Sequence, residues 1–452
     1  MTKWLLALLL LVTIFVSACG SSAVPTVTVA PMPPTPAFVS TSSVTENNSG
    51  VPAGQFDAAR AYEDNRKLAV DIGKRVAGTP GGASAADYIA SEFEKSGLTV
   101  TRQPFTFQMW EDRGTTVQIV APTTGTLDAQ PFQYSPAGQV EGKLVLVPGI
   151  GSRDDFSKVN VRGQIALVKR GTLTFIAKAN NAQQAGASAI IVYNDIPQDF
   201  SGRVDESVSI PALGINGIAG DELVQQLRKG DVRVQIKSDT GVSESTGYNV
   251  IGTLRGASDE TIVLGGHYDT VPAGPGAGDN GSGTATLIEL ARIAGQSKTA
   301  PQHTLVFIAF DAEELGLLGS EAYVKSLTSQ QVQNIRAMLN FDMLGAGSGP
   351  LLLMGDGSVA LLARSSAQEL GIQAHNAQLP SNAGSDHYSF ERRGVDTVFF
   401  MRDYRLLHTP EDTIDQVKPE YLGEAGRVAE RLLQRLDATP IHKDSTSFAP
   451  TQ

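Results

Sequence analysis

The chain has 452 residues, of which 41% are hydrophobic and 18% charged, a composition typical of folded globular domains. Lys and Arg total 36 against 47 Asp and Glu, so the net charge is 36 − 47 = −11, and no basic stretch favours nucleic-acid binding. Cys19 is the single cysteine, which excludes an intrachain disulfide and a cysteine-built zinc site. Any metal must therefore be held by carboxylates and by some of the six histidines.

The first residues have the pattern of a bacterial lipoprotein signal peptide, predicted over residues 1–18. Lys3 precedes an apolar run, Trp4 to Val16, that is too short to span a membrane comfortably, since a span needs about 20 residues. Small residues then precede Cys19, which predicts cleavage before this residue and lipidation of its thiol; an ordinary signal peptide is the alternative. More than one acyl chain would anchor the exported protein stably to the extracytoplasmic face of the cell envelope.

A tether and two domains are predicted after the signal. Residues 19–54 are rich in Pro, Ser and Thr and read as a disordered linker, because such a composition cannot bury a core. Folded sequence is predicted from about Phe56. The pattern predicts helices over 58–72 and 83–95, then a strand over 98–107. The predicted division is a catalytic domain of residues 55–116 and 246–440, an insert of residues 117–245, and a flexible tail of residues 441–452.

The insert has the texture of a smaller, β-rich module. Short strands are predicted at 144–147, 165–169 and 189–193, with one helix over 175–185. No histidine occurs between Arg113 and Gly266, so this segment is predicted to be accessory rather than catalytic.

From about Tyr248, apolar strands alternate with helices. This pattern predicts an α/β fold with a mostly parallel, mixed sheet covered by helices on both faces. Ligands in such sheets collect beyond the carboxyl ends of the strands. The predicted strands are 249–254, 261–264, 304–310, 337–341 and 397–401, and two of the helices are 283–294 and 321–327.

Acidic and imidazole side chains follow several of these strands. Singly, each group has an ordinary explanation, such as a helix N-cap for Asp279. Together they are predicted to converge on one crevice, where crowded carboxylates need a cation. The groups are His267-Tyr268-Asp269, Asp279-Asn280, Asp311-Ala312-Glu313-Glu314, Asn340-Phe341-Asp342 and His408-Thr409-Pro410-Glu411-Asp412.

This motif set resembles that of the di-zinc metallopeptidases that include bacterial leucyl aminopeptidases, aminopeptidase Y and glutamate carboxypeptidase. The resemblance extends over residues 56–437 and implies a zinc-exopeptidase-like fold. The inserted region resembles a protease-associated (PA) domain, on the stretches Val161–Gly171 and Ile210–Ile215.

The resemblance implies a role for each motif residue and two Zn²⁺ ions per chain. Asp279 would bridge the ions, and Glu313 would be the general base. Asp269 would orient His267. Some family members place an oxyanion-stabilising tyrosine directly before the last histidine, but this position is Leu407 here, so Tyr404, with Tyr388 behind it, is the fallback candidate. The five implied metal ligands are His267, Asp279, Glu314, Asp342 and His408.

The predicted function is therefore an aminopeptidase that hydrolyses N-terminal residues from peptides, with a family-level preference for large apolar residues such as leucine. A metallocarboxypeptidase stays open, because Arg402 and Arg405 are close in sequence to His408. A glutaminyl-cyclase-like enzyme and a non-catalytic binding protein are further alternatives. The segment Ser385–Phe390 is predicted to line the site rather than to bind metal.

Overall fold

The computed structural model describes residues 28–29, 50–51, 56–379 and 383–439. The predicted signal peptide, Cys19, most of the linker and the tail of residues 441–452 lie outside this part of the chain. Within it, no helix has the length and apolar character needed to cross a membrane. In the linker region, Thr28–Val29 forms strand β1, which pairs antiparallel with β17 (Ala377–Gln378).

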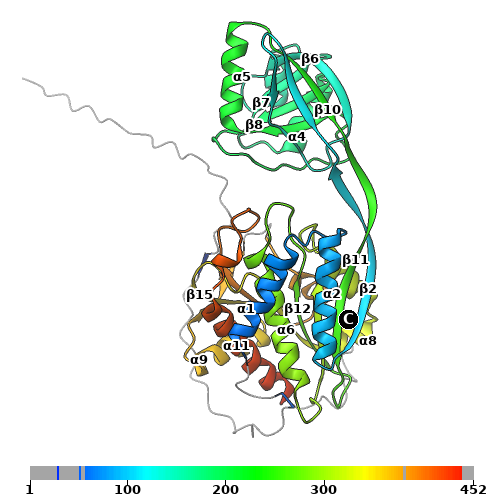
Figure 1. The fold of residues 1–452 in the computed structure, drawn as a ribbon, viewed down its shortest axis with the longest axis vertical. Helices are drawn as coiled ribbons and strands as arrows, with labels where there is room; N and C mark the ends of the chain where they lie inside the picture. Colours follow the sequence, from blue (N-terminus) through cyan, green and yellow to red (C-terminus); the bar gives the residue numbers. More distant parts are fainter. Residues whose placement is uncertain (1–27, 30–49, 52–55, 380–382, 440–452) are drawn as a thin grey trace, which may run out of the picture. The chain divides into compact units, whose positions relative to one another are not determined.

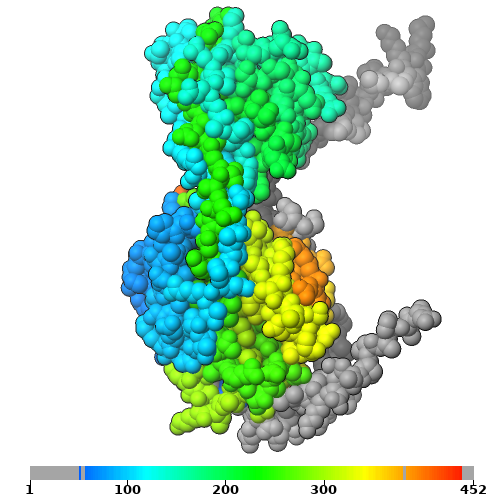
Figure 2. All heavy atoms as spheres, turned by 90° about the vertical axis from the view of Figure 1, so that its right-hand side faces the viewer, coloured from blue at the N-terminus to red at the C-terminus, as the bar shows by residue number. Residues whose placement is uncertain are grey.

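The chain divides into two compact units. One contains the segments up to Phe105 and from Gly247 onward, and the other is Thr106–Thr246. The second unit begins within strand β2 (Thr99–Asp112), ahead of the expected residue 117. In the first unit, the N-terminal segment (blue) and a much later segment (yellow) contribute to one surface in Figure 2.

The first unit is built on a mixed sheet of eight described strands, in the order β16-β15-β18-β14-β12-β13-β11-β2 (Figure 1). The four central strands pair in parallel, whereas β11 runs antiparallel to β13 and β15 runs antiparallel to β18. This arrangement confirms the predicted mostly parallel α/β sheet. The strands are β11 (Thr240–Leu254), β12 (Thr261–His267), β13 (Thr304–Phe310), β14 (Ile335–Phe341), β15 (Ser348–Met354), β16 (Ala374–His375) and β18 (Thr397–Asp403).

Helices cover both faces of this sheet because successive side chains of a strand point to opposite faces. In β12, Leu264 joins a core with α1 (Ala58–Arg66), α2 (Pro80–Lys95), α6 (Ser282–Gly295) and α11 (Pro419–Asp437). Figure 1 shows these four helices on one side of the sheet. Val263, the residue before Leu264, packs on the other face of the sheet with Tyr323 of α7 (Leu318–Ser326) and Phe390 of α10 (His387–Glu391).

The N-terminal elements differ in detail from the expected ones. The helix predicted over 58–72 is α-helical only to Arg66 and continues as a π-helix, Lys67–Ile72. Residues before Phe56 already pack against the first unit. Val51 is buried in its core, and the amide of Gly50 donates to the carboxylate of Asp437 (2.9 Å).

A buried charge network joins α1, α2 and α6. The guanidinium of Arg292 lies 3.2 Å from Asp64 and 2.9 Å from Glu92, and it also contacts Glu289, which Arg60 contacts as well. Glu289 is completely buried. Loss of Arg292 would leave buried carboxylates without their main counter-charge, so the network contributes to the stability of the helical layer.

The second unit is β-rich, as predicted. Its eight described strands follow the order β4-β3-β10-β6-β7-β8-β9-β5. Four of them are parallel neighbours with apolar clusters on both faces of the sheet. These are β6 (Gly138–Leu146), β7 (Ile165–Lys169), β8 (Ala189–Tyr193) and β9 (Ala212–Ile215), flanked by α4 (Phe175–Gln184) and α5 (Gly217–Lys229). The outer strands are β3 (Thr116–Ala121), β4 (Gly125–Leu127), β5 (Gln130–Pro131) and β10 (Arg233–Ser238).

Candidate metal centre

Three adjacent parallel strands deliver candidate ligands to one edge of the sheet. His267 is the last residue of β12, Glu313 and Glu314 follow β13, and Asp342 follows β14 directly. Because β12 pairs in parallel with both β13 and β14, these strand ends meet, as the sequence predicted.

Asp279 lies between the two candidate imidazoles. It belongs to the irregular turn Ala277–Gly281, which leads into α6, and its peptide bond to Asn280 is cis. Its Oδ1 is 3.3 Å from Nε2 of His267, and its Oδ2 is 3.2 Å from Nε2 of His408. One carboxylate thus faces both histidines, each with a different oxygen.

The remaining carboxylates divide between the same two histidines. Oδ1 of Asp342 is 3.4 Å from Nε2 of His267, and Oε2 of Glu314 is 2.8 Å from Nε2 of His408. Oε2 of Glu313 is farther from the imidazoles, at 4.0 Å from Nε2 of His267. The structure therefore brings together all five predicted ligands and the predicted base.

The electrostatics of the cluster are those of crowded, buried acids. Burial and the neighbouring carboxylates raise the pKa of Glu314 to about 7 and the pKa of Glu313 well above its ordinary value. Burial alone would lower the pKa of His408, but Asp279 and Glu314 raise it to about 11. The pKa of Asp279 is held well below its usual range by His267 and His408, which outweigh its burial.

These side chains fit a divalent cation. Oε1 of Glu314, Oδ1 of Asp342 and both carboxylate oxygens of Asp386 are buried without a hydrogen bond to any described residue. Two sets of ligand atoms, both including His267, each lie within 4.8 Å of one another. A cation would neutralise the repelling carboxylates, and imidazole with carboxylate is a ligand set that suits zinc.

Asp269 fixes two of the ligand-bearing segments at once. Its main-chain oxygen is 3.2 Å from Nδ1 of His267, and its Oδ1 is 3.5 Å from the same atom. Its carboxylate also accepts the main-chain amides of Glu313 (3.0 Å) and Glu314 (3.3 Å). It thus lies where a carboxylate that orients the imidazole was expected, and it also fastens the Glu313–Glu314 turn.

Tyr404 and Asp412 form a support behind Asp279. Asp412 accepts the amides of Gly278 (2.6 Å) and Asp279 (3.0 Å) and the hydroxyl of Tyr404 (2.8 Å). The Tyr404 hydroxyl is thus engaged with a carboxylate, and its assignment as an oxyanion donor stays a prediction. Asp412 therefore holds the turn that carries Asp279.

The backbone is strained at three residues in or next to the candidate metal ligands. Ala312 precedes Glu313, Met343 follows Asp342, and His408 is itself a candidate ligand; all three have positive φ, at 56°, 53° and 61°. Residues with side chains rarely adopt this conformation, which costs about 1–3 kcal/mol and is concentrated at functional sites.

Two further residues that the sequence analysis did not single out hold the Asp279 turn. The buried side chain of Asn65 donates to the carbonyl of Ala277 (2.9 Å). The buried guanidinium of Arg75 donates to the carbonyls of Pro275 and Gly276. Both come from N-terminal elements without a motif around them, so no sequence signal marked them.

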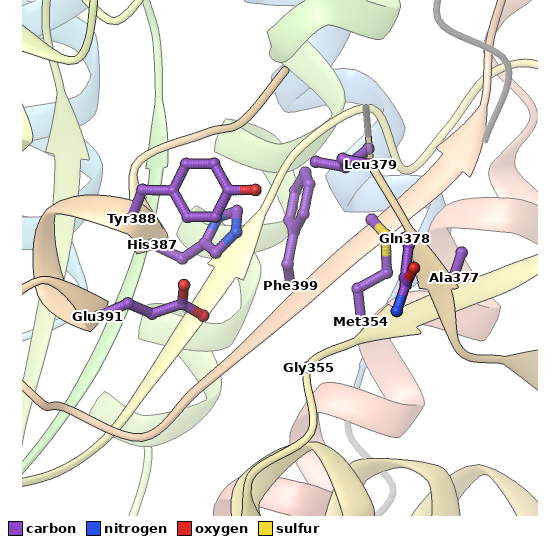
Figure 3. Close-up of a pocket in the computed structure, with 9 residues that line it drawn as sticks. All are labelled: Met354, Gly355, Ala377, Gln378, Leu379, His387, Tyr388, Glu391 and Phe399. Carbon is purple, nitrogen blue, oxygen red and sulfur yellow. The ribbon is translucent and has the colours of Figure 1, made fainter. Parts of the chain in front are cut away.

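A pocket of about 250 Å³ lies beside the segment Ser385–Phe390 (Figure 3). His387 stacks on Phe399, with ring centroids 4.5 Å apart, and burial lowers the pKa of His387 to about 3, so its ring is neutral. The preceding Asp386 is close enough to the candidate ligands to help raise the pKa of Glu313, which burial raises most. The pocket is lined by Met354, Gly355, Ala377, Gln378, Leu379, His387, Tyr388, Glu391 and Phe399.

Comparisons with known proteins agree with this arrangement. Residues 249–433 match the model of peptidase family M28, and residues 114–223 match that of the PA domain. Aminopeptidase YwaD of Bacillus subtilis is 33% identical over 399 residues, which cover 82% of this chain and 83% of YwaD. The structure of BSAP, a zinc aminopeptidase from Bacillus subtilis, matches with 30% identity and a TM-score of 0.73, over 84% of this chain and 95% of that chain.

A further relative is described as a lipoprotein. The probable lipoprotein aminopeptidase LpqL of Mycobacterium tuberculosis is 33% identical over 305 residues, which cover 65% of this chain but only 59% of LpqL. The extensive match to YwaD, the family model and the shared fold confirm the family predicted from the sequence. The chain is a member of peptidase family M28 that carries a PA domain inserted into its peptidase domain.

Proposed function

We propose that this chain is an exported, lipid-anchored aminopeptidase that uses two zinc ions and Glu313 to release N-terminal residues from peptides. The observation that carries the proposal is the position of Asp279, whose two carboxylate oxygens face different imidazoles. The names of YwaD and BSAP support the activity, and the description of BSAP as a zinc aminopeptidase also supports the metal.

Each zinc ion would have its own ligands besides Asp279. His267 and Asp342 would hold one ion, and Glu314 and His408 the other. Bound zinc supplies Lewis acidity that polarises the scissile carbonyl and acidifies water. With three protein ligands for each ion, counting the shared one, the site leaves room for substrate.

Glu313 is the residue placed to move the proton. Its main-chain amide is fastened by Asp269, while its carboxylate is the member of the cluster that lies farthest from the imidazoles. Burial raises the pKa of Glu313, so its ionised carboxylate is a stronger base than that of an exposed glutamate. Glu313 would take a proton from the attacking water and deliver it to the leaving amine.

The charge of the site favours an amino terminus over a carboxyl terminus. The cluster is rich in carboxylates, which attract a free α-ammonium group. A carboxypeptidase would need a cation for the terminal carboxylate, yet Arg402 is buried, donates to the carbonyl of Gly349 (2.7 Å) and Glu424, and stacks on Tyr421 (4.0 Å). Arg402 is therefore occupied by structural partners.

The pocket of Figure 3 would receive the side chain of the substrate's first residue. Met354, Leu379 and Phe399 give it an apolar wall, and its volume suits a large aliphatic side chain. Met354→Phe is expected to narrow the pocket and Met354→Ala to widen it. The ratio of kcat/KM for phenylalanine over leucine p-nitroanilide should fall in the first variant and rise in the second, each by about tenfold, because small changes in an apolar pocket have effects of this size.

The ratio provides its own control, because a change in enzyme concentration or folding affects both substrates equally. An unchanged ratio in both variants would show that the pocket does not hold the substrate side chain.

The lipid anchor is proposed on the sequence around Cys19, with LpqL as a relative described as a lipoprotein. In a bacterial host, the wild-type protein is expected in the membrane fraction after processing. Cys19→Ala removes the acceptor thiol, so the variant should lose lipid labelling and membrane association. Equal lipid labelling of both proteins would contradict the assignment.

The activity is tested with purified protein and leucine p-nitroanilide, with and without a chelator. Release of p-nitroaniline that stops on chelation and returns with zinc supports the proposal. Pyroglutamate formation from an N-terminal glutamine substrate would favour a cyclase instead. Ligand binding without turnover would favour a binding protein.

A further inference from the structure

Arg75 lies behind the metal cluster, between two ligand-bearing segments. Its side chain is completely buried. Nε donates to the carbonyl of Tyr268 (2.7 Å), the residue after His267. Nη2 donates to the carbonyl of Gly276 (2.8 Å), three residues before Asp279. One planar group therefore joins the end of β12 to the Asp279 turn.

The same side chain is fixed to the N-terminal part of the unit. Nη1 donates to the carbonyls of Pro275 (2.6 Å), Gly73 (3.2 Å) and Leu68 (3.4 Å). The main-chain amide of Arg75 adds a bond to Oγ1 of Thr270 (3.0 Å). Arg75 thus connects both metal-binding segments to the π-helix Lys67–Ile72 and the turn after it.

Arg75 provides a positive charge without binding a carboxylate directly. All five acceptors of its guanidinium are main-chain carbonyls. Burial lowers the pKa of Arg75 to about 10, against the attraction of Asp269 and Asp412, so the group is cationic at neutral pH. The ligand carboxylates keep their oxygens free for metal, while the cation behind them offsets part of their repulsion.

The Asp279 turn is shaped to accept this side chain. Gly276 has a φ of 61°, a left-handed conformation, and a Cβ there would clash with the carbonyl oxygen of Asp279 and with Thr270 and would also lie 3.2 Å from Nη2 of Arg75. Asn65 fastens the next residue of the turn through the carbonyl of Ala277. The position of Asp279 is therefore determined from its N-terminal side by Arg75 and Asn65 together.

We propose that Arg75 is a positioning residue of the metal centre, which sets the separation of His267 and Asp279 by binding the backbones that carry them. The inference rests on the proposed two-zinc function and concerns a residue that touches neither substrate nor, in our assignment, metal. A lysine would keep the positive charge. Its single ammonium group, however, cannot bind the carbonyls of Tyr268 and Gly276 at the same time, as the planar guanidinium does.

The test compares Arg75→Lys and Arg75→Met with wild type and with Arg292→Met as the control. Arg292 is another partly buried arginine of the same unit, but its partners are carboxylates of the helical layer. Zinc affinity is measured on metal-free protein by competition with a chromogenic chelator, the unfolding midpoint by circular dichroism, and kcat and KM on leucine p-nitroanilide.

Arg75→Lys is expected to fold and to bind zinc at least about tenfold more weakly, because removing groups that orient metal ligands typically has this effect. It should lose kcat with little change in KM, since Arg75 does not touch the substrate. Arg292→Met should have a lower unfolding midpoint but unchanged zinc affinity. If Arg75→Met does not fold, Arg75→Lys decides the question.

Two different results would overturn different claims. Wild-type zinc affinity in Arg75→Lys would overturn the positioning role and leave the proposed function intact. Wild-type protein that binds no zinc would overturn the proposed function, and this inference with it.

Discussion

Glu313→Gln is expected to lower kcat by about 10²–10⁴-fold while the protein keeps its zinc, because general acid–base catalysis contributes a factor of this size. Glutamine has the shape of glutamate but cannot accept the proton of the attacking water. In the structure, Glu313 is partly buried beside the candidate ligands, and its Oε2 lies 4.0 Å from Nε2 of His267. Its backbone, held by Asp269, should stay in place in the variant.

The measurement is kcat on leucine p-nitroanilide together with the zinc content of the same preparation. Glu321→Gln is the matched control, since Glu321 lies on α7 and pairs with Lys325 and Arg392 at the surface. The control should retain wild-type activity. Full activity in Glu313→Gln would remove Glu313 as the base, and a loss that merely follows the loss of zinc would reassign it as a ligand.

Asp279→Asn is expected to have the second large effect, on metal content as well as on activity. The amide has one oxygen where Asp279 presents two, toward His267 and His408, and it carries no charge to offset two cations. Removing groups that only orient ligands typically costs 10–100-fold in metal affinity or activity, so the loss of this carboxylate should exceed about 100-fold.

Zinc per chain after dialysis, measured by elemental analysis, and kcat/KM test this expectation. Asp87→Asn is the control, an exposed carboxylate of α2 paired with Arg102. Zinc should fall from two per chain to one or fewer in Asp279→Asn and stay at two in Asp87→Asn. Retention of two zinc ions and of activity in Asp279→Asn would exclude the bridging role.

The central sheet and the cluster at its edge could be predicted from the sequence because both follow simple regularities. Apolar runs such as Thr304–Phe310 marked buried parallel strands, and charged residues directly after them had to meet at one edge. His267 and Asp342 were therefore located by position, and the family resemblance supplied their roles.

The supporting groups could not be predicted in this way. Arg75 and Asn65 bind main-chain carbonyls of Tyr268 and Ala277, which lie 193 and 212 positions away in the chain, and the sequence records no such contact. Tyr404 was a fallback candidate because Leu407 occupies the family's tyrosine position, but only the structure shows its hydroxyl bound to Asp412. The pocket depends on Met354, on the unpredicted strand β15, and on Phe399, which the apolar run of residues 397–401 marked only as a strand residue.

The most direct test of the account is the anomalous diffraction of zinc-loaded crystals at the zinc absorption edge. The account predicts two strong peaks on either side of Asp279, one beside His267 and Asp342 and the other beside Glu314 and His408. A single peak that Asp279 does not share, or peaks away from these side chains, would contradict it.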